Sequence, residues 1–173
     1  MNRITARTVE EGTGGPFAAL VLDSDTGDVV SAGVNLVLSA NVAPAHAEVV
    51  ALSLAQTRVG DWNPGTDPAR PRALVVNAQP CVMCLGTLIW SGVKALDFSV
   101  PGFEAERITG FDEGPVPADW REQLESAALP STRGCSRKSA RRFWKTSEAA
   151  WQQARLRSTT ADDLDLGGGG GPP

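Results

Sequence analysis

A predicted strand runs directly into a predicted helix in the stretch ALVVNAQPCVMC, which spans residues 73–84. Its first four residues are all apolar, which is typical of a strand buried in the centre of a sheet. Pro80 then marks an abrupt turn, and a helical pattern extends from Cys81 to about Trp90. Cys81 and Cys84 therefore lie at a helix start, where backbone N–H groups and the helix dipole favour thiolates.

His46, the only histidine of the chain, stands 35 residues before Cys81 and two residues before Glu48. In mid-helix, side chains two residues apart would point about 200° apart. Pro44 places His46 at the start of a helix instead, where both side chains can reach one point. An imidazole and two thiolates make three zinc ligands, and three protein ligands plus a water is the catalytic form of a zinc site. The pattern predicts zinc ligands His46, Cys81 and Cys84, with Glu48 as a catalytic group acting on the bound water.

Each part of this pattern also has a simpler interpretation. His46 could be an ordinary polar residue at a helix start, and the two cysteines could be small buried hydrophobic residues. Proline, spacing, order and helix context together favour the metal site. Cys135 lies far away in a basic, polar segment, and we interpret it as an incidental thiol.

Composition places the chain among ordinary globular proteins of one domain, with 173 residues, 42% hydrophobic and 21% charged. Residues 1–132 carry 8 basic and 16 acidic side chains, whereas residues 133–157 carry 8 basic and one acidic. The acidic body argues against a nucleic-acid-binding core. Three cysteines cannot form a disulfide framework, and neither a leader segment nor a membrane-spanning apolar run is present, so we expect a cytoplasmic protein with no membrane partner.

Hydrophobic periodicity predicts alternating strands and helices. The predicted strands are 17–22, 29–38, 73–76 and 93–100, and the predicted helices are 46–59, 81–90, a short one near 104–108, and 120–128. This order implies crossover connections and a layered α/β domain. Residues 1–13 form a polar N-terminal segment and residues 14–130 the main domain, followed by a basic amphipathic helix over 131–157 and a disordered tail over 158–173.

At these residues the chain resembles the cytidine/deoxycytidylate deaminase superfamily, whose zinc signature is H-x-E followed by P-C-x-x-C. The likeness covers roughly residues 14–124. In the branch that holds bacterial guanine deaminases and tRNA adenosine deaminases, four segments recur: Gly15-Pro16-Phe17, Gly33-Val34-Asn35, Ala45-His46-Ala47-Glu48 and Cys81 to Gly86. Two others, residues 89–93 and 110–115, look most like guanine deaminase. Gln79 stands where this branch usually has glutamate.

The resemblance implies a three-layer α-β-α fold with a central mixed five-stranded sheet, and a homodimer. It also implies that a zinc-activated water attacks the ring carbon bearing the amino group, while Glu48 moves a proton to the departing ammonia. The substrate would be a small molecule, most simply guanine, which would yield xanthine.

Five further residues acquire substrate roles from this resemblance. Asn35 would hydrogen-bond the base, and Phe17 and Trp90 would form apolar walls. Glu113, with Asp112 as second choice, would accept from guanine's N1–H and 2-amino group. The competing interpretations are a turn-stabilising amide for Asn35, core packing for the two aromatic residues, and a solvated loop for the two acidic ones.

Three other functions stay open at this point. A tRNA adenosine deaminase could use residues 133–157 as a basic arm, although we expect no nucleic-acid partner. A cytosine or triazine deaminase would use the same zinc chemistry. A catalytically inactive deaminase-like binding module is the non-enzymatic alternative, and the complete ligand set with Glu48 argues against it.

Overall fold

The computed structural model describes residues 2–112, 114–127, 129 and 131–134. Its strands are β1 (Ala18–Asp23), β2 (Val29–Val34), β3 (Arg72–Ala78), β4 (Ala95–Val100) and β5 (Ser131–Gly134). Its helices are α1 (Asn2–Glu10), α2 (Val37–Ala40), α3 (Ala47–Val59), α4 (Val82–Ser91), α5 (Gly102–Thr109) and α6 (Trp120–Ser126), with a short 3-10 helix, η1 (Pro64–Thr66).

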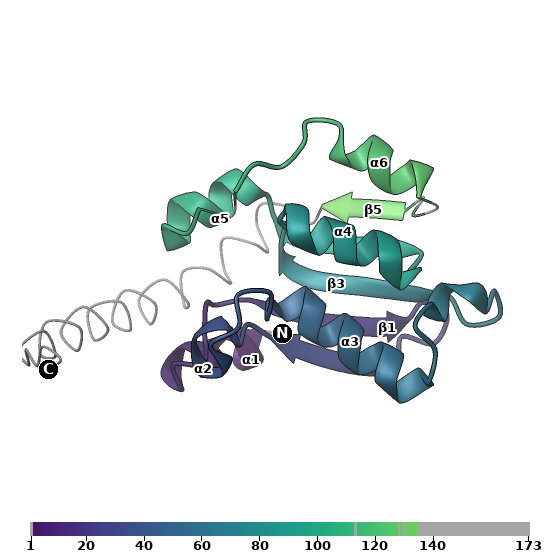
Figure 1. The fold of residues 1–173 in the computed structure, drawn as a ribbon, viewed down its shortest axis with the longest axis horizontal. Helices are drawn as coiled ribbons and strands as arrows, with labels where there is room; N and C mark the ends of the chain where they lie inside the picture. Colours follow the sequence, from purple (N-terminus) through teal and green to yellow (C-terminus); the bar gives the residue numbers. More distant parts are fainter. Residues whose placement is uncertain (1, 113, 128, 130, 135–173) are drawn as a thin grey trace, which may run out of the picture.

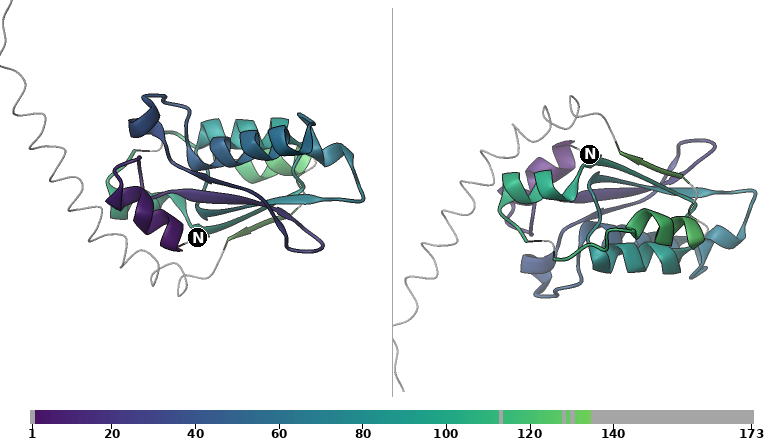
Figure 2. Two further views of the ribbon diagram at one scale, coloured as in Figure 1. Left: turned by 90° about the horizontal axis from the view of Figure 1, so that it is seen from below. Right: turned by 90° about the horizontal axis from the view of Figure 1, so that it is seen from above.

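The strands form one mixed sheet in the order β2-β1-β3-β4-β5 (Figure 1). β1 pairs antiparallel with both β2 and β3, whereas β3 pairs parallel with β4 and β4 parallel with β5. Helices α3, α4 and α6 cover one face, and α1 and α5 lie on the other (Figure 2). The expected three-layer α/β architecture is therefore confirmed.

The core lies between the sheet and the helices that cover it. β3 is central, as its apolar sequence predicted, and Leu74 and Val76 on it are fully buried. Leu52 of α3, Leu88 of α4 and Leu96 of β4 join them in the same cluster. Because the crossovers return each strand in the same direction, the carboxyl ends of β3 and β4 meet at one edge of the sheet.

β2 forms an edge of the sheet and contains an irregularity. Val21 pairs with Ser31 and Leu22 with Val29, so Val30 is the extra residue of a β-bulge. The carbonyl of Val30 accepts a hydrogen bond from Arg58 Nη1 of α3 at 3.0 Å. The backbone oxygen of Val30 is therefore hydrogen-bonded by a side chain of α3, which lies outside the sheet.

The structure corrects three sequence-based expectations. Residues 2–10, expected to be a polar segment, form α1, because Thr5, Thr8 and Val9 recur at helical spacing on a buried face. The second strand ends at Val34, not residue 38, because Asn35 turns the chain toward α2.

The C-terminal region begins as a strand. Residues 131–134, expected to start the basic helix, form β5 because they pair with β4 and complete the parallel edge of the sheet. Residues 135–157 of that predicted helix and the predicted tail over 158–173 lie outside the described residues. Among the described residues, no helix has the length and apolar character needed to cross a membrane.

Candidate metal centre and active site

Two helix starts lie side by side at the carboxyl edge of β3. His46 is the N-cap residue of α3, with an extended backbone (φ −68°, ψ 155°), and Glu48 lies in the first turn. Cys81 is the N-cap residue of α4 (φ −70°, ψ 172°), and Cys84 follows in the first turn. Both prolines that precede these caps therefore have the role expected from the sequence, which is to turn the chain into a helix.

The ligand atoms of His46, Cys81 and Cys84 all lie within 4.8 Å of one another. Nδ1 of His46 is 3.7 Å from the Sγ atom of each cysteine. In tetrahedral zinc coordination, with Zn–N of about 2.0 Å and Zn–S of about 2.3 Å, a nitrogen and a sulfur ligand are about 3.6 Å apart. The three side chains thus fit a zinc ion and leave its fourth position open.

Glu48 is buried, with 6% of its surface exposed, and its carboxyl interacts with Cys84 and Cys81. Burial, with a smaller contribution from the charge of Cys81, raises the pKa of Glu48 to about 7, against the lowering effects of its own backbone N–H and of His46. A pKa close to neutrality suits a carboxyl that both takes up and returns a proton. Glu48 therefore faces the predicted ligands, as its catalytic role requires.

The two thiols are strongly coupled. A hydrogen bond from Cys84 lowers the pKa of Cys81 to about 4, and the interaction with His46 adds to this effect. The same thiol–thiol hydrogen bond, together with burial, raises the pKa of Cys84. The protein itself therefore favours the thiolate at Cys81, and a zinc ion would favour deprotonation of both cysteines.

Close packing against β2 fixes the start of α3. A Cβ atom at Gly33 would lie 2.3 Å from the carbonyl oxygen of Ala47 and 2.4 Å from the amide nitrogen of Ala51. Ser31 donates a hydrogen bond of 2.7 Å to the carbonyl of Ala51. Because Ala47 lies between His46 and Glu48, this contact positions both functional side chains.

Asn35 and Phe17 lie together at the ends of β2 and β1. The backbone N–H of Asn35 donates to the carbonyl of Phe17 at 3.1 Å, and Oδ1 of Asn35 accepts from Val37 N–H at 3.1 Å. The turn-stabilising role is therefore present. Among the described residues, no partner binds Nδ2 of Asn35, so its side-chain amide still has donors to offer.

Phe17 is buried and packs against Phe111, with ring centroids 6.1 Å apart. This is the core-packing interpretation of Phe17. Gly14 lies directly above Asn35, because a Cβ atom there would come within 2.2 Å of Asn35 Oδ1. A side chain at position 14 would therefore displace the amide that the resemblance assigns to the substrate.

The structure does not bring Trp90 to the metal residues. Nine residues of helix, about 13 Å, separate it from Cys81, and 75% of its surface is exposed. Core packing is therefore wrong for Trp90. Asp112 is exposed and accepts a hydrogen bond from Gly114 N–H at 2.8 Å, as a solvated loop residue would, while Glu113 and Cys135 lie outside the described residues.

Two amides make positioning contacts that the sequence did not reveal, although Gln79 was already noted as a departure from the family pattern. Asn77, only 2% exposed, accepts a hydrogen bond from Ala18 N–H and donates one to the carbonyl of Pro16. Gln79 Oε1 accepts from Gly102 N–H at 3.2 Å, which ties the segment before Cys81 to the start of α5. In the sequence, the only sign of the role of Asn77 is that a polar residue directly follows the apolar run of β3.

Comparison with known proteins agrees with this geometry. Residues 3–100 match the family described as the cytidine and deoxycytidylate deaminase zinc-binding region. The guanine deaminase of Bacillus subtilis is 30% identical over 122 residues, which are 70% of this chain and 73% of that protein.

Two solved structures extend the likeness to the fold. A guanine deaminase from Nitrosomonas europaea has a TM-score of 0.77 and 37% identity, covering 85% of this chain and 80% of that one. The protein NE0047 in complex with 2,6-diaminopurine has a TM-score of 0.73 and 35% identity, covering 87% and 76% of the two chains. With its H-x-E and C-x-x-C residues converging on one point, this chain belongs to the cytidine and deoxycytidylate deaminase family of zinc-binding enzymes.

Proposed function

We propose that the protein is a zinc-dependent guanine deaminase, which hydrolyses guanine to xanthine and ammonia. The observation that carries this proposal is the convergence of His46, Cys81 and Cys84, with the buried carboxyl of Glu48 beside the two thiols. The choice of guanine rests on the guanine deaminases among the relatives and on the purine bound to NE0047.

A zinc ion held by His46, Cys81 and Cys84 would activate a water molecule for attack on the amino-bearing carbon of the base. Glu48 takes the proton of that water and returns it to the nitrogen that leaves as ammonia. Asn35 donates from Nδ2 to an acceptor atom of the base, because its Oδ1 is already held by Val37 N–H. Phe17, Trp90, Asp112 and Glu113 remain proposals as substrate contacts, and Trp90 would need a partner subunit to act as one.

The function is tested by measuring ammonia release from guanine with zinc-loaded protein. Glu48→Gln should keep the zinc and lower kcat by about 10²- to 10⁴-fold, because the proton carrier is lost. Glu125→Gln, an exposed glutamate of α6, is the matched control and should leave kcat unchanged. Retention of full turnover by the Glu48 variant would overturn the role of Glu48.

A substrate panel separates the alternatives. Zinc-loaded protein should release ammonia from guanine faster than from cytosine, triazines or adenosine in tRNA. Turnover of tRNA that falls steeply with salt would favour the RNA-editing function instead. A zinc-loaded protein that is inactive on the whole panel would support a binding module.

We also infer a homodimer in the cytoplasm. Val82, Ile89 and Trp90 expose apolar surface on α4, and a second copy of the chain would cover it. Sedimentation equilibrium should give twice the chain mass, and Trp90→Ser should shift it toward the monomer. The reduced thiols that the zinc site requires agree with a reducing compartment, which cell fractionation checks.

A further inference from the structure

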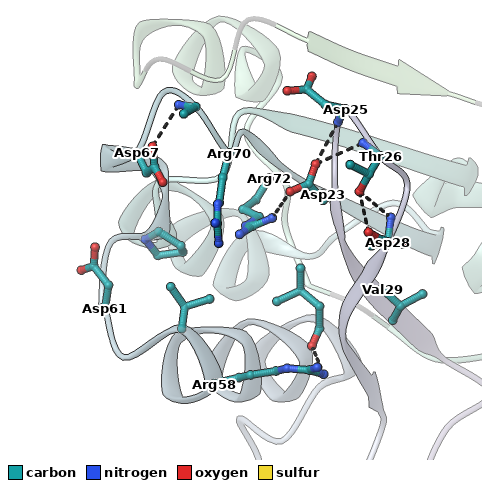
Figure 3. Close-up of a pocket in the computed structure, with 14 residues that line it drawn as sticks. Asp23, Asp25, Thr26, Asp28, Val29, Arg58, Asp61, Asp67, Arg70 and Arg72 are labelled. Carbon is teal, nitrogen blue, oxygen red and sulfur yellow. Dashed lines mark hydrogen bonds and ion pairs between the residues drawn. The ribbon is translucent and has the colours of Figure 1, made fainter.

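A cavity of about 740 Å³ lies at the opposite end of the sheet from the metal residues. Its walls are the β1–β2 turn, the end of α3, the loop before β3 and the first residue of β3 (Figure 3). His46 begins α3 and Arg58 lies at its other end, about 18 Å away along the helix. The cavity is therefore separate from the catalytic residues.

Arg72 is the buried charge of this cavity. Its side chain is 8% exposed, and its Nη1 atom forms an ion pair with Asp23. Its Nε atom is buried and has no hydrogen-bond partner among the described residues. This buried donor costs free energy, but because it is closed to solvent, a ligand in the cavity could bind Arg72 only through the terminal nitrogens of the guanidinium.

Arg70 places a second guanidinium beside the first. Figure 3 shows the two side chains lying next to each other, with both ends directed into the space above α3. Arg70 has no ion pair or hydrogen bond from its side chain to another described residue. Two adjacent positive charges repel each other, and an anion between them would remove that repulsion.

Asp23 pairs with Arg72, but no other acidic residue of the wall forms an ion pair with either guanidinium group among the described residues. Asp25 and Asp61 point away from the two guanidinium groups in Figure 3. Asp67 accepts a hydrogen bond from Ala69 N–H at 2.9 Å, and Asp28 accepts one from the Thr26 hydroxyl at 2.9 Å. The carboxylates of Asp67 and Asp28 thus accept hydrogen bonds within their own turns.

The rest of the wall contributes apolar surface from Val30, Val59 and Pro64. The volume is within the range of small-molecule sites, about 300–1,000 Å³, and is larger than an inorganic ion needs. Paired arginines suit a doubly charged phosphate, because each guanidinium presents several donors to its oxygens.

We propose that this cavity binds a small organic phosphate, with the phosphate group between Arg70 and Arg72 and the organic part against Val30, Val59 and Pro64. The site is independent of the proposed deaminase activity, since none of its residues contacts the metal ligands.

Calorimetric titration of the full chain with ribose 5-phosphate, at fixed ionic strength, tests the proposal. We expect saturable binding of one molecule per chain, competition by inorganic phosphate, and no binding of ribose. Arg70→Ala should raise Kd about tenfold or more, because charge-assisted hydrogen bonds are lost. Arg107→Ala removes another exposed arginine, on α5, and should leave Kd unchanged.

Arg72→Lys is a second variant, which keeps the charge but loses the planar set of donors, and it too should raise Kd. Circular dichroism confirms that each variant is folded. Absence of saturable ribose 5-phosphate binding would overturn the proposal, as would equal affinity for ribose or an unchanged Kd in Arg70→Ala.

Discussion

Asn35 shows how one side chain can serve the fold and the substrate at once. Its Oδ1 atom holds Val37 N–H, while Nδ2 has no partner among the described residues. Asn35→Asp keeps an acceptor for Val37 but removes the donor. We expect kcat/KM for guanine to fall about tenfold, the value of one hydrogen bond to a substrate. Unchanged steady-state kinetics would show that Asn35 serves only the turn.

The cluster of His46, Cys81 and Cys84 could be predicted from sequence because each part of it is a short local pattern at a helix start. A proline, a helix start and a C-x-x-C pair fix the direction of Cys81 and Cys84 without knowledge of the rest of the fold. Trp90 could not be placed in this way, because its exposure depends on what packs around α4. Asn77 was missed for the same reason, since its partners lie about 60 residues earlier in the chain.

At the scale of elements, Asn77 extends the pairing of β1 and β3 with a side chain. The backbone ladder between these strands ends at Ala19 and Val76, and the amide of Asn77 then binds Pro16 and Ala18. Asn77→Ala would leave two buried backbone groups unpaired. Urea unfolding should show a loss of about 2–4 kcal/mol in the free energy of unfolding.

Gln123→Ala, which removes an exposed amide on α6, is the control for Asn77 and should change stability by less than about 0.5 kcal/mol. A similar loss in both variants would contradict the structural role of Asn77.

Gly33 determines how closely α3 approaches the sheet. Gly33→Ala should destabilise the protein by about 1–3 kcal/mol, because the added Cβ would overlap the backbone at Ala47 and Ala51. It should also weaken zinc binding, since Ala47 adjoins His46. Both effects can be measured on one preparation, by thermal unfolding and by metal analysis.

Gly86→Ala is the matched change on α4. A Cβ at Gly86 would meet no atom within 4 Å, so alanine should raise stability by about 0.5–1 kcal/mol through its better helix propensity. We therefore expect Gly33→Ala to lower stability and Gly86→Ala to raise it. A change of the same sign in both variants would show that the close approach at Gly33 does not determine stability.

The elements missed from the sequence share a physical cause. α1 buries threonines as well as Val9, so hydrophobic periodicity alone does not reveal it. β5 has only four residues and owes its extended form to pairing with β4, not to its own apolar pattern. Long, strongly apolar elements such as β3 were predictable because burial dictated their composition.

At the scale of the whole molecule, the ion pair between Asp23 and Arg72 joins the end of β1 to the start of β3. Hydrogen bonds from Thr26 N–H and then Asp25 N–H, with the charge of Arg72, lower the pKa of Asp23. The ionised carboxylate of Asp23 therefore stabilises the folded protein fully at any pH above the ordinary aspartate pKa of about 3.9. This stabilisation is lost as the pH falls through the lowered pKa that Asp23 has in the folded protein.

Asp23→Asn should accordingly be less stable than the native chain at pH 7, and this difference should shrink as the pH falls below about 4. Urea midpoints at a series of pH values measure it. A difference that persists unchanged at pH 2.5 would contradict the assignment.

Zinc should stabilise the entire domain, because it binds α3 and α4 together and only in the folded state. Removal by a chelator should lower Tm by roughly 10 °C if zinc is present at about 1,000 times its Kd. Cys84→Ser should have a low Tm both with and without the chelator. If the Tm of the native chain is unchanged by the chelator, the result would argue against bound zinc.

The bulge at Val30 also affects how neighbouring molecules meet in solution. An open strand edge attracts other chains, and a kinked edge whose oxygen is already occupied by Arg58 accepts a foreign strand poorly. Arg58 therefore occupies an acceptor that an added strand would need, which makes pairing of a foreign strand with this edge less favourable.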